Sequence, residues 1–137
     1  MKHFEIFKWD PMLDTGVDII DQQHKMLTRI FNKQIDYRDS FKGFDALKKT
    51  LERVIKFAEL HFKTEEDLLK KHNYPDYDYH KYEHTKIMDT LKKFESEINR
   101  GNSRVSSEFL EFLYEWLDHH VRYEDIKFSG FLKAAGC

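Results

Sequence analysis

Cysteine, glycine and proline are all scarce in this sequence. Its 137 residues include one Cys, five Gly and two Pro. The single thiol, Cys137, excludes an internal disulfide and any cysteine cluster for zinc or iron–sulfur chemistry. Because few residues interrupt a helix, long uninterrupted segments remain, and these favour a helical protein.

The sequence also lacks an excess of charge of one sign and a long apolar run. Lys and Arg number 23 against 25 Asp and Glu, for a formal net charge of -2, so no basic surplus is available for nucleic acid or an anionic membrane. No segment approaches the roughly 20 apolar residues that cross a bilayer, and residues 1–5 lack the apolar core of a secretion signal. We therefore expect a cytoplasmic protein that binds neither nucleic acid nor membranes.

Apolar residues recur three or four positions apart, as in Leu47, Leu51 and Val54, and no useful two-residue alternation occurs. This periodicity predicts helices and no strands. Breaks containing Gly or Pro leave four such segments, at about 17–38, 44–72, 77–100 and 105–132. Short connections force neighbouring helices to run antiparallel. We predict an all-α fold with a single domain over residues 1–137, an antiparallel up-down-up-down four-helix bundle at about 17–132 with an N-terminal arm at about 1–16.

Histidine is abundant, with eight residues, and several lie on the predicted inward faces. In an antiparallel bundle the first and third helices begin where the second and fourth end. Six polar residues on the inward faces then converge at one end: His24, His61, Glu65, His80, His84 and His120. Buried imidazoles and carboxylates lose their hydration unless another group replaces it. This convergence favours a metal site.

Two spacings in this set support metal binding. His61 and Glu65 are four residues apart, as are His80 and His84, so each pair projects from adjacent turns of one helix face. An isolated His-x-x-x-His pair more often belongs to a surface or to a satisfied core. Five inward histidines at one level with a carboxylate reverse that preference.

The fourth helix offers two candidate carboxylates. Glu124 follows His120 by four residues and Asp125 by five. Spacing favours Glu124, because Asp125 would point about 140° away from His120 on an ideal helix. A local π-type turn or a bend would bring Asp125 to the core instead.

Four sequence stretches identify a family resemblance: IDQQH at 20–24, HFKTEE at 61–66, YP at 74–75 followed by HKYEH at 80–84, and WLDHHV at 116–121 with Asp125. Over residues 9–128 the chain resembles the hemerythrins, and most closely the bacterial single-domain hemerythrin-like proteins. The resemblance implies a non-haem centre of two iron ions joined by an oxo or hydroxo bridge.

The same resemblance implies a role for each residue. His80, His84 and His120 would bind one iron. His24 and His61 would bind the other, and Glu65 and Asp125 would bridge the two. Apolar positions that match the family's oxygen pocket are Leu27, Phe62, Trp116, Leu117 and Val121. Five imidazoles, two bridging carboxylates and one oxygen bridge leave a single octahedral position open, on the iron with two histidines.

The function implied is reversible binding of dioxygen for transport, storage, delivery or sensing, without enzymatic activity. One alternative is a di-iron enzyme, such as an oxidase, a peroxide or nitric oxide reductase, or a ferroxidase. Another is an oxygen- or iron-responsive signalling module whose protein partner the sequence does not identify. Oxygen-activating bundle enzymes usually carry Glu-x-x-His pairs, and the candidate ligands contain none. We expect His3, His72 and Glu66 at the surface, and His119 at the surface or behind a ligand.

Overall fold

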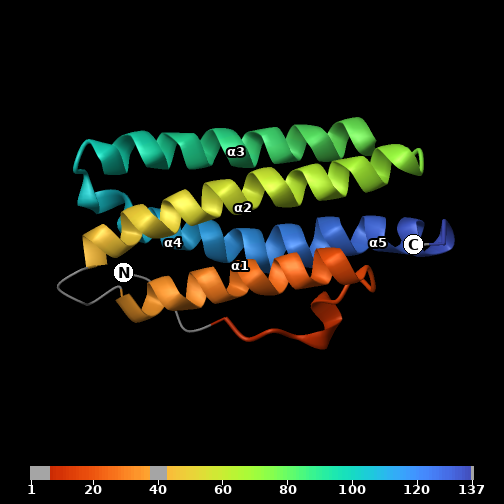
Figure 1. Ribbon diagram of the computed structural model, residues 1–137, viewed down its shortest axis with the longest axis horizontal. Coiled ribbons are helices and arrows are strands. Elements are labelled where there is room, and N and C mark those ends of the chain that lie inside the picture. Colours follow the sequence, from red (N-terminus) through yellow and green to blue (C-terminus); the bar gives the residue numbers. More distant parts are fainter. Residues whose placement is uncertain (1–6, 38–42, 137) are drawn as a thin grey trace.

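The computed structural model describes residues 7–37 and 43–136, and within them every regular element is helical. In chain order the elements are η1 (Pro11–Leu13), α1 (Asp18–Tyr37), α2 (Gly43–Lys71), α3 (Tyr77–Asn99), η2 (Ser103–Val105), α4 (Ser106–Glu115), η3 (Trp116–Asp125) and α5 (Ile126–Ala134). The last three follow one another along a single line, so the chain forms four long helical segments side by side (Figure 1). The predicted all-α four-helix bundle is confirmed.

Left-handed residues end two of the long helices. Asn73, two residues after the end of α2, has a φ of 57°, and the N–H of Tyr74 donates to the carbonyl of Leu69 at 2.9 Å. Gly101, with a φ of 82°, plays the same part after α3. This backbone reversal satisfies the last carbonyls of a helix, and Pro75 then prevents α2 from continuing. The short connections that result keep neighbouring helices antiparallel.

The N-terminal arm packs along the bundle beside α1 (Figure 1). Phe7 and Leu13 are buried in the core. The side-chain amide of Asn32 forms two hydrogen bonds with the backbone of Phe7. It accepts one from the N–H at 2.7 Å and donates one to the carbonyl at 3.0 Å. The carboxylate of Asp21 accepts hydrogen bonds from the N–H and the hydroxyl of Thr15, at 2.7 and 2.6 Å. These bonds hold the arm and the start of α1 in a fixed relation.

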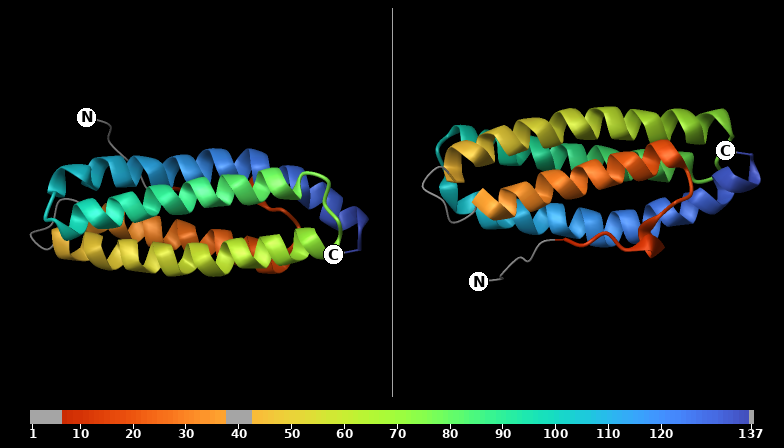
Figure 2. Two further views of the ribbon diagram at one scale, coloured as in Figure 1. Left: turned by 90° about the horizontal axis from the view of Figure 1, so that it is seen from above. Right: turned by 60° about the horizontal axis from the view of Figure 1, so that its bottom comes forward.

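Among the described residues, the core has two apolar clusters of unequal size. The small cluster consists of Val17, Ile20, Leu69, Phe128 and Leu132. The large cluster includes Leu27, Phe31, Leu47, Leu51, Leu91, Phe109, Leu113, Trp116, Leu117 and Val121. The beginnings of α1 and α3 and the end of α2 meet at the end of the bundle that α5 occupies (Figure 2). Along α1, His24 separates Ile20 of the small cluster from Leu27 of the large one, so a polar layer lies between them.

None of the helices described has the length and the apolar composition needed to cross a lipid bilayer.

Candidate metal centre

The polar layer contains seven buried side chains from all four long segments. They are His24, His61, Glu65, His80, His84, His120 and Asp125. His120 is the most exposed of the seven, at 6%, whereas both carboxylates are fully buried. The six residues that the inward stripes of the sequence placed together are therefore brought together, and Asp125 joins them.

A π-helix explains how Asp125 reaches the core. Residues Trp116–Asp125 form the π-helix η3, in which the backbone hydrogen bond connects residues five apart rather than four. His120 and Asp125 therefore lie on one face. The ideal α-helical spacing that favoured Glu124 does not apply here, and the side chain of Glu124 lies outside the described residues.

The Glu65 carboxylate directs its two oxygens at different histidines. Its Oε1 lies 2.6 Å from Nε2 of His61 and 3.6 Å from Nε2 of His24. Its Oε2 lies 2.8 Å from Nε2 of His80 and 3.4 Å from Nε2 of His84. One carboxylate thus spans two groups of imidazoles.

The Asp125 carboxylate spans the same two groups from the opposite helical segment. Its Oδ2 lies 2.8 Å from Nε2 of His24. Its Oδ1 lies 3.4 Å from Nε2 of His120 and 3.7 Å from Nε2 of His80. All five imidazoles therefore present Nε2 to the carboxylates.

Two overlapping groups of these residues could each hold a metal ion. One group is Glu65, His80, His84 and His120, and the other is His24, His61, Glu65 and Asp125. Within each group the possible ligand atoms lie within 4.8 Å of one another. The division into three and two histidines is the one that the family resemblance implied.

The layer requires positive charge. Burial opposes ionisation of both carboxyls, yet the neighbouring imidazoles outweigh it, holding the pKa of Glu65 well below its usual value and lowering that of Asp125. Burial likewise opposes protonation of His24 and His84, but the carboxylates raise the pKa of each to about 9. Burial prevails at His61, whose pKa is lowered. Two buried anions need compensating cations, which protonated imidazoles or metal ions supply.

The donor atoms fit a pair of transition-metal ions. Several buried atoms form no hydrogen bond among the described residues, including Oε1 of Glu65, both carboxylate oxygens of Asp125, and Nε2 of His84 and His120. Unsatisfied buried polar atoms are costly, and these approach one another without hydrogen-bond geometry. Imidazole nitrogen with carboxylate oxygen is a donor set that suits iron, and also zinc, manganese or cobalt.

Two residues behind the imidazoles were not predicted as part of the site. Nδ1 of His61 lies 2.7 Å from Oε1 of Gln23, and Nδ1 of His84 lies 2.9 Å from Oε2 of Glu66. Glu66, expected at the surface, is half-buried: its side chain is 21% exposed and turns toward His84 on α3. The sequence signal that could have identified them is adjacency, because Gln23 precedes His24 and Glu66 follows Glu65.

Aromatic rings of the large cluster stack on two of the imidazoles. Phe62 stacks on His84 with ring centroids 4.0 Å apart and an interplanar angle of 10°, and Phe57 stacks on His61 at 5.2 Å and 14°. The five residues proposed to form an oxygen pocket all belong to the large cluster: Leu27, Phe62, Trp116, Leu117 and Val121. The polar layer therefore borders hydrocarbon.

The remaining histidines are outside both groups, so far as the structure describes them. His119 is exposed and His72 is half-buried, and neither contributes to a metal-binding group. His3 and Cys137 lie outside the described residues.

Comparison with known proteins agrees with this geometry. Residues 15–132 match the family described as the Hemerythrin HHE cation binding domain. A myohemerythrin of Theromyzon tessulatum is 31% identical over 92% of this chain and 93% of its own length. A bacteriohemerythrin of Clostridium acetobutylicum is 28% identical over 88% of this chain and 96% of its own.

A solved structure extends the likeness to three dimensions. The crystal structure of wild-type hemerythrin superposes with a TM-score of 0.84 at 26% identity, covering 93% of this chain and 98% of the other. A family match over most of the chain, a relative above 30% identity and a shared bundle lead to one conclusion. This chain is a member of the hemerythrin family.

Proposed function

We propose that this protein binds dioxygen reversibly at a non-haem di-iron centre, for transport, storage, delivery or sensing. His80, His84 and His120 would hold one iron, His24 and His61 the other, and Glu65 and Asp125 would bridge them together with an oxo or hydroxo group. One observation carries the proposal: each buried carboxylate directs one oxygen toward the three-histidine group and the other toward the two-histidine group.

The iron pair, when bound, would supply electrons to dioxygen and one open coordination position. The chain would hold the ligands in position and keep water away from them. Phe62, Trp116 and Val121 are buried, and Phe62 stacks on His84. An apolar lining excludes water and the protons that water carries. Dioxygen is then favoured to leave unchanged, which supports a binding protein rather than an enzyme.

An anaerobic titration tests this function. The purified protein is loaded with ferrous ion under argon, exposed to air and returned to argon while its visible spectrum is recorded. We expect two irons per chain and a coloured form that appears in air and disappears under argon over repeated cycles. Irreversible bleaching with production of peroxide or water would contradict a carrier and favour an oxidase.

Glu65→Ala tests whether the polar layer is the site that produces the colour in this titration. Because Glu65 approaches both histidine groups, its removal should abolish the reversible colour while the helical circular dichroism remains. A coloured form that persists in this variant would show that the polar layer is not the binding site.

A further inference from the structure

His61 and His84 hold corresponding places on either side of Glu65. Nε2 of His61 faces one oxygen of this carboxylate at 2.6 Å, and Nε2 of His84 faces the other at 3.4 Å. The outer nitrogen of each ring is held by a different kind of group, because Nδ1 of His61 meets the neutral amide of Gln23 and Nδ1 of His84 meets the carboxylate of Glu66. The two halves of the centre thus differ in the charge behind an imidazole.

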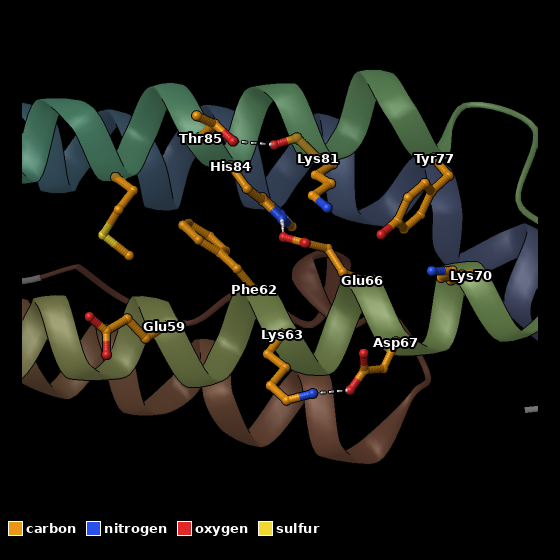
Figure 3. Close-up of a pocket in the computed structure, with 11 residues that line it drawn as sticks. Glu59, Phe62, Lys63, Glu66, Asp67, Lys70, Tyr77, Lys81, His84 and Thr85 are labelled. Atoms are coloured by element: carbon orange, nitrogen blue, oxygen red, sulfur yellow. Dashed lines mark hydrogen bonds and ion pairs between the residues drawn. The ribbon is translucent and has the colours of Figure 1, made fainter.

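Glu66 directs its carboxylate at the ring of His84. Its carboxylate lies on the floor of a groove between α2 and α3, beside the ring edge of His84 (Figure 3). The nearby cation Lys63 pairs with Asp67 at 2.8 Å instead. Among the described residues, His84 is the only hydrogen-bond or ion-pair partner of Glu66.

Gln23 provides the contrast within the same protein. Its side chain is buried between α1 and α2, where Oε1 faces His61 and Nε2 donates to the hydroxyl of Thr64 at 3.2 Å. The amide orients the His61 ring through this hydrogen bond, but it adds no charge.

A carboxylate that accepts the outer N–H of a metal-bound imidazole makes the inner nitrogen a stronger donor, and it does so more than a neutral acceptor. Given the di-iron centre proposed above, we propose that Glu66 is a positioning residue that acts through His84. It makes the three-histidine group a stronger electron donor to the iron that this group would hold. That half then holds ferric ion more firmly than the Gln23–His61 half does. The asymmetry of charge tunes the reduction potential of the pair.

Four variants separate charge from shape. Glu66→Gln keeps the shape and a hydrogen-bond acceptor but removes the charge, whereas Glu66→Ala removes both. Gln23→Glu adds a charge behind the opposite imidazole. Glu59→Gln is the matched control, because Glu59 also lines the groove, at its far end from His84 (Figure 3), and contacts no candidate ligand.

The measurement is the midpoint potential of the iron-loaded proteins, from a mediated titration under argon without dioxygen. We expect Glu66→Gln to retain two irons and to lose the preference for ferric ion about tenfold, which is a rise of about 59 mV for one electron. Gln23→Glu should lower the potential, and Glu59→Gln should leave it unchanged. Loss of iron to a chelator should be about 10- to 100-fold faster in Glu66→Ala than in wild type.

An unchanged midpoint potential in Glu66→Gln with both irons bound would overturn the inference. If Glu66 were merely structural, Glu66→Ala would lose thermal stability and neither variant would change the potential. If the Glu66 variants fail to fold, Gln23→Glu decides alone, and an unmoved potential again overturns it. Failure of the proposed function is recognised separately. Wild-type protein that binds two irons but no dioxygen contradicts the function, and the midpoint potentials still test the role of Glu66. Wild-type protein that binds no iron contradicts both.

Discussion

The polar layer and the large apolar cluster are built by the same four helical segments, yet they are held together differently. In the large cluster, each fully buried side chain such as Phe31 or Phe109 stabilises the fold by about 1.5–3 kcal/mol. In the polar layer, burial of each carboxylate, Glu65 and Asp125, costs several kcal/mol, which nearby positive charge must offset. The contrast teaches that the bundle is stabilised mainly at one level and holds its candidate metal ligands at another.

The largest effect should follow a change that disables the polar layer alone. Because Glu65 lies close to both histidine groups, Glu65→Ala should abolish the binding of both proposed iron ions. Elemental analysis after anaerobic loading measures this. Retention of one iron would mean that the two sites do not depend on a shared carboxylate.

The opposite change weakens only the large cluster. Phe109 is fully buried and packs edge-to-face against Phe94, with centroids 5.5 Å apart, so Phe109→Ala should lower the free energy of unfolding by about 3–5 kcal/mol. Denaturant unfolding of the metal-free protein gives this value. Iron content at low temperature should stay at two per chain, and its loss would show that the two levels are not separable.

Removing the metal tests how far the polar layer depends on its cations. A metal that binds only the folded chain, at a free concentration about 1,000 times its dissociation constant, adds about 4 kcal/mol to stability. Chelation should therefore lower the melting temperature while the helical signal at low temperature remains. Equal melting temperatures with and without metal would contradict coupling between cation binding and folding.

The smallest effect is expected at His119, beside a ligand in sequence but on the outside of the bundle. His119 is exposed and His120 is buried. His119→Ala should leave the iron content at two, whereas His120→Ala should lose one iron or both. Equal losses in the two variants would mean that η3 presents a different face from the one described.

Most of the fold follows from periodicity and its interruptions. The predicted segments at about 17–38, 44–72 and 77–100 match α1, α2 and α3 closely, because Gly and Pro mark the breaks. The burial of Phe7 and Leu13 in the core was not foreseen, since the arm has no helical period to indicate which side chains face inward.

The site shows where ideal geometry stops being informative. His24, His61 and His84 lie on inward stripes that any regular helix would produce. Asp125 does not, because a π-helix depends on local backbone hydrogen bonding that the spacing of apolar residues does not encode. The sequence admitted Asp125 only if the helix were distorted there, and the family resemblance chose it over Glu124. Gln23 and Glu66 were missed because their role depends on which ring each one touches across a helix interface.

Anomalous diffraction at the iron edge tests the central claim most directly, using crystals grown from protein loaded with ferrous ion. We predict two peaks between the carboxylates of Glu65 and Asp125, one surrounded by the three-histidine group and the other by His24 and His61. A single peak, or peaks away from the polar layer, would contradict the di-iron centre.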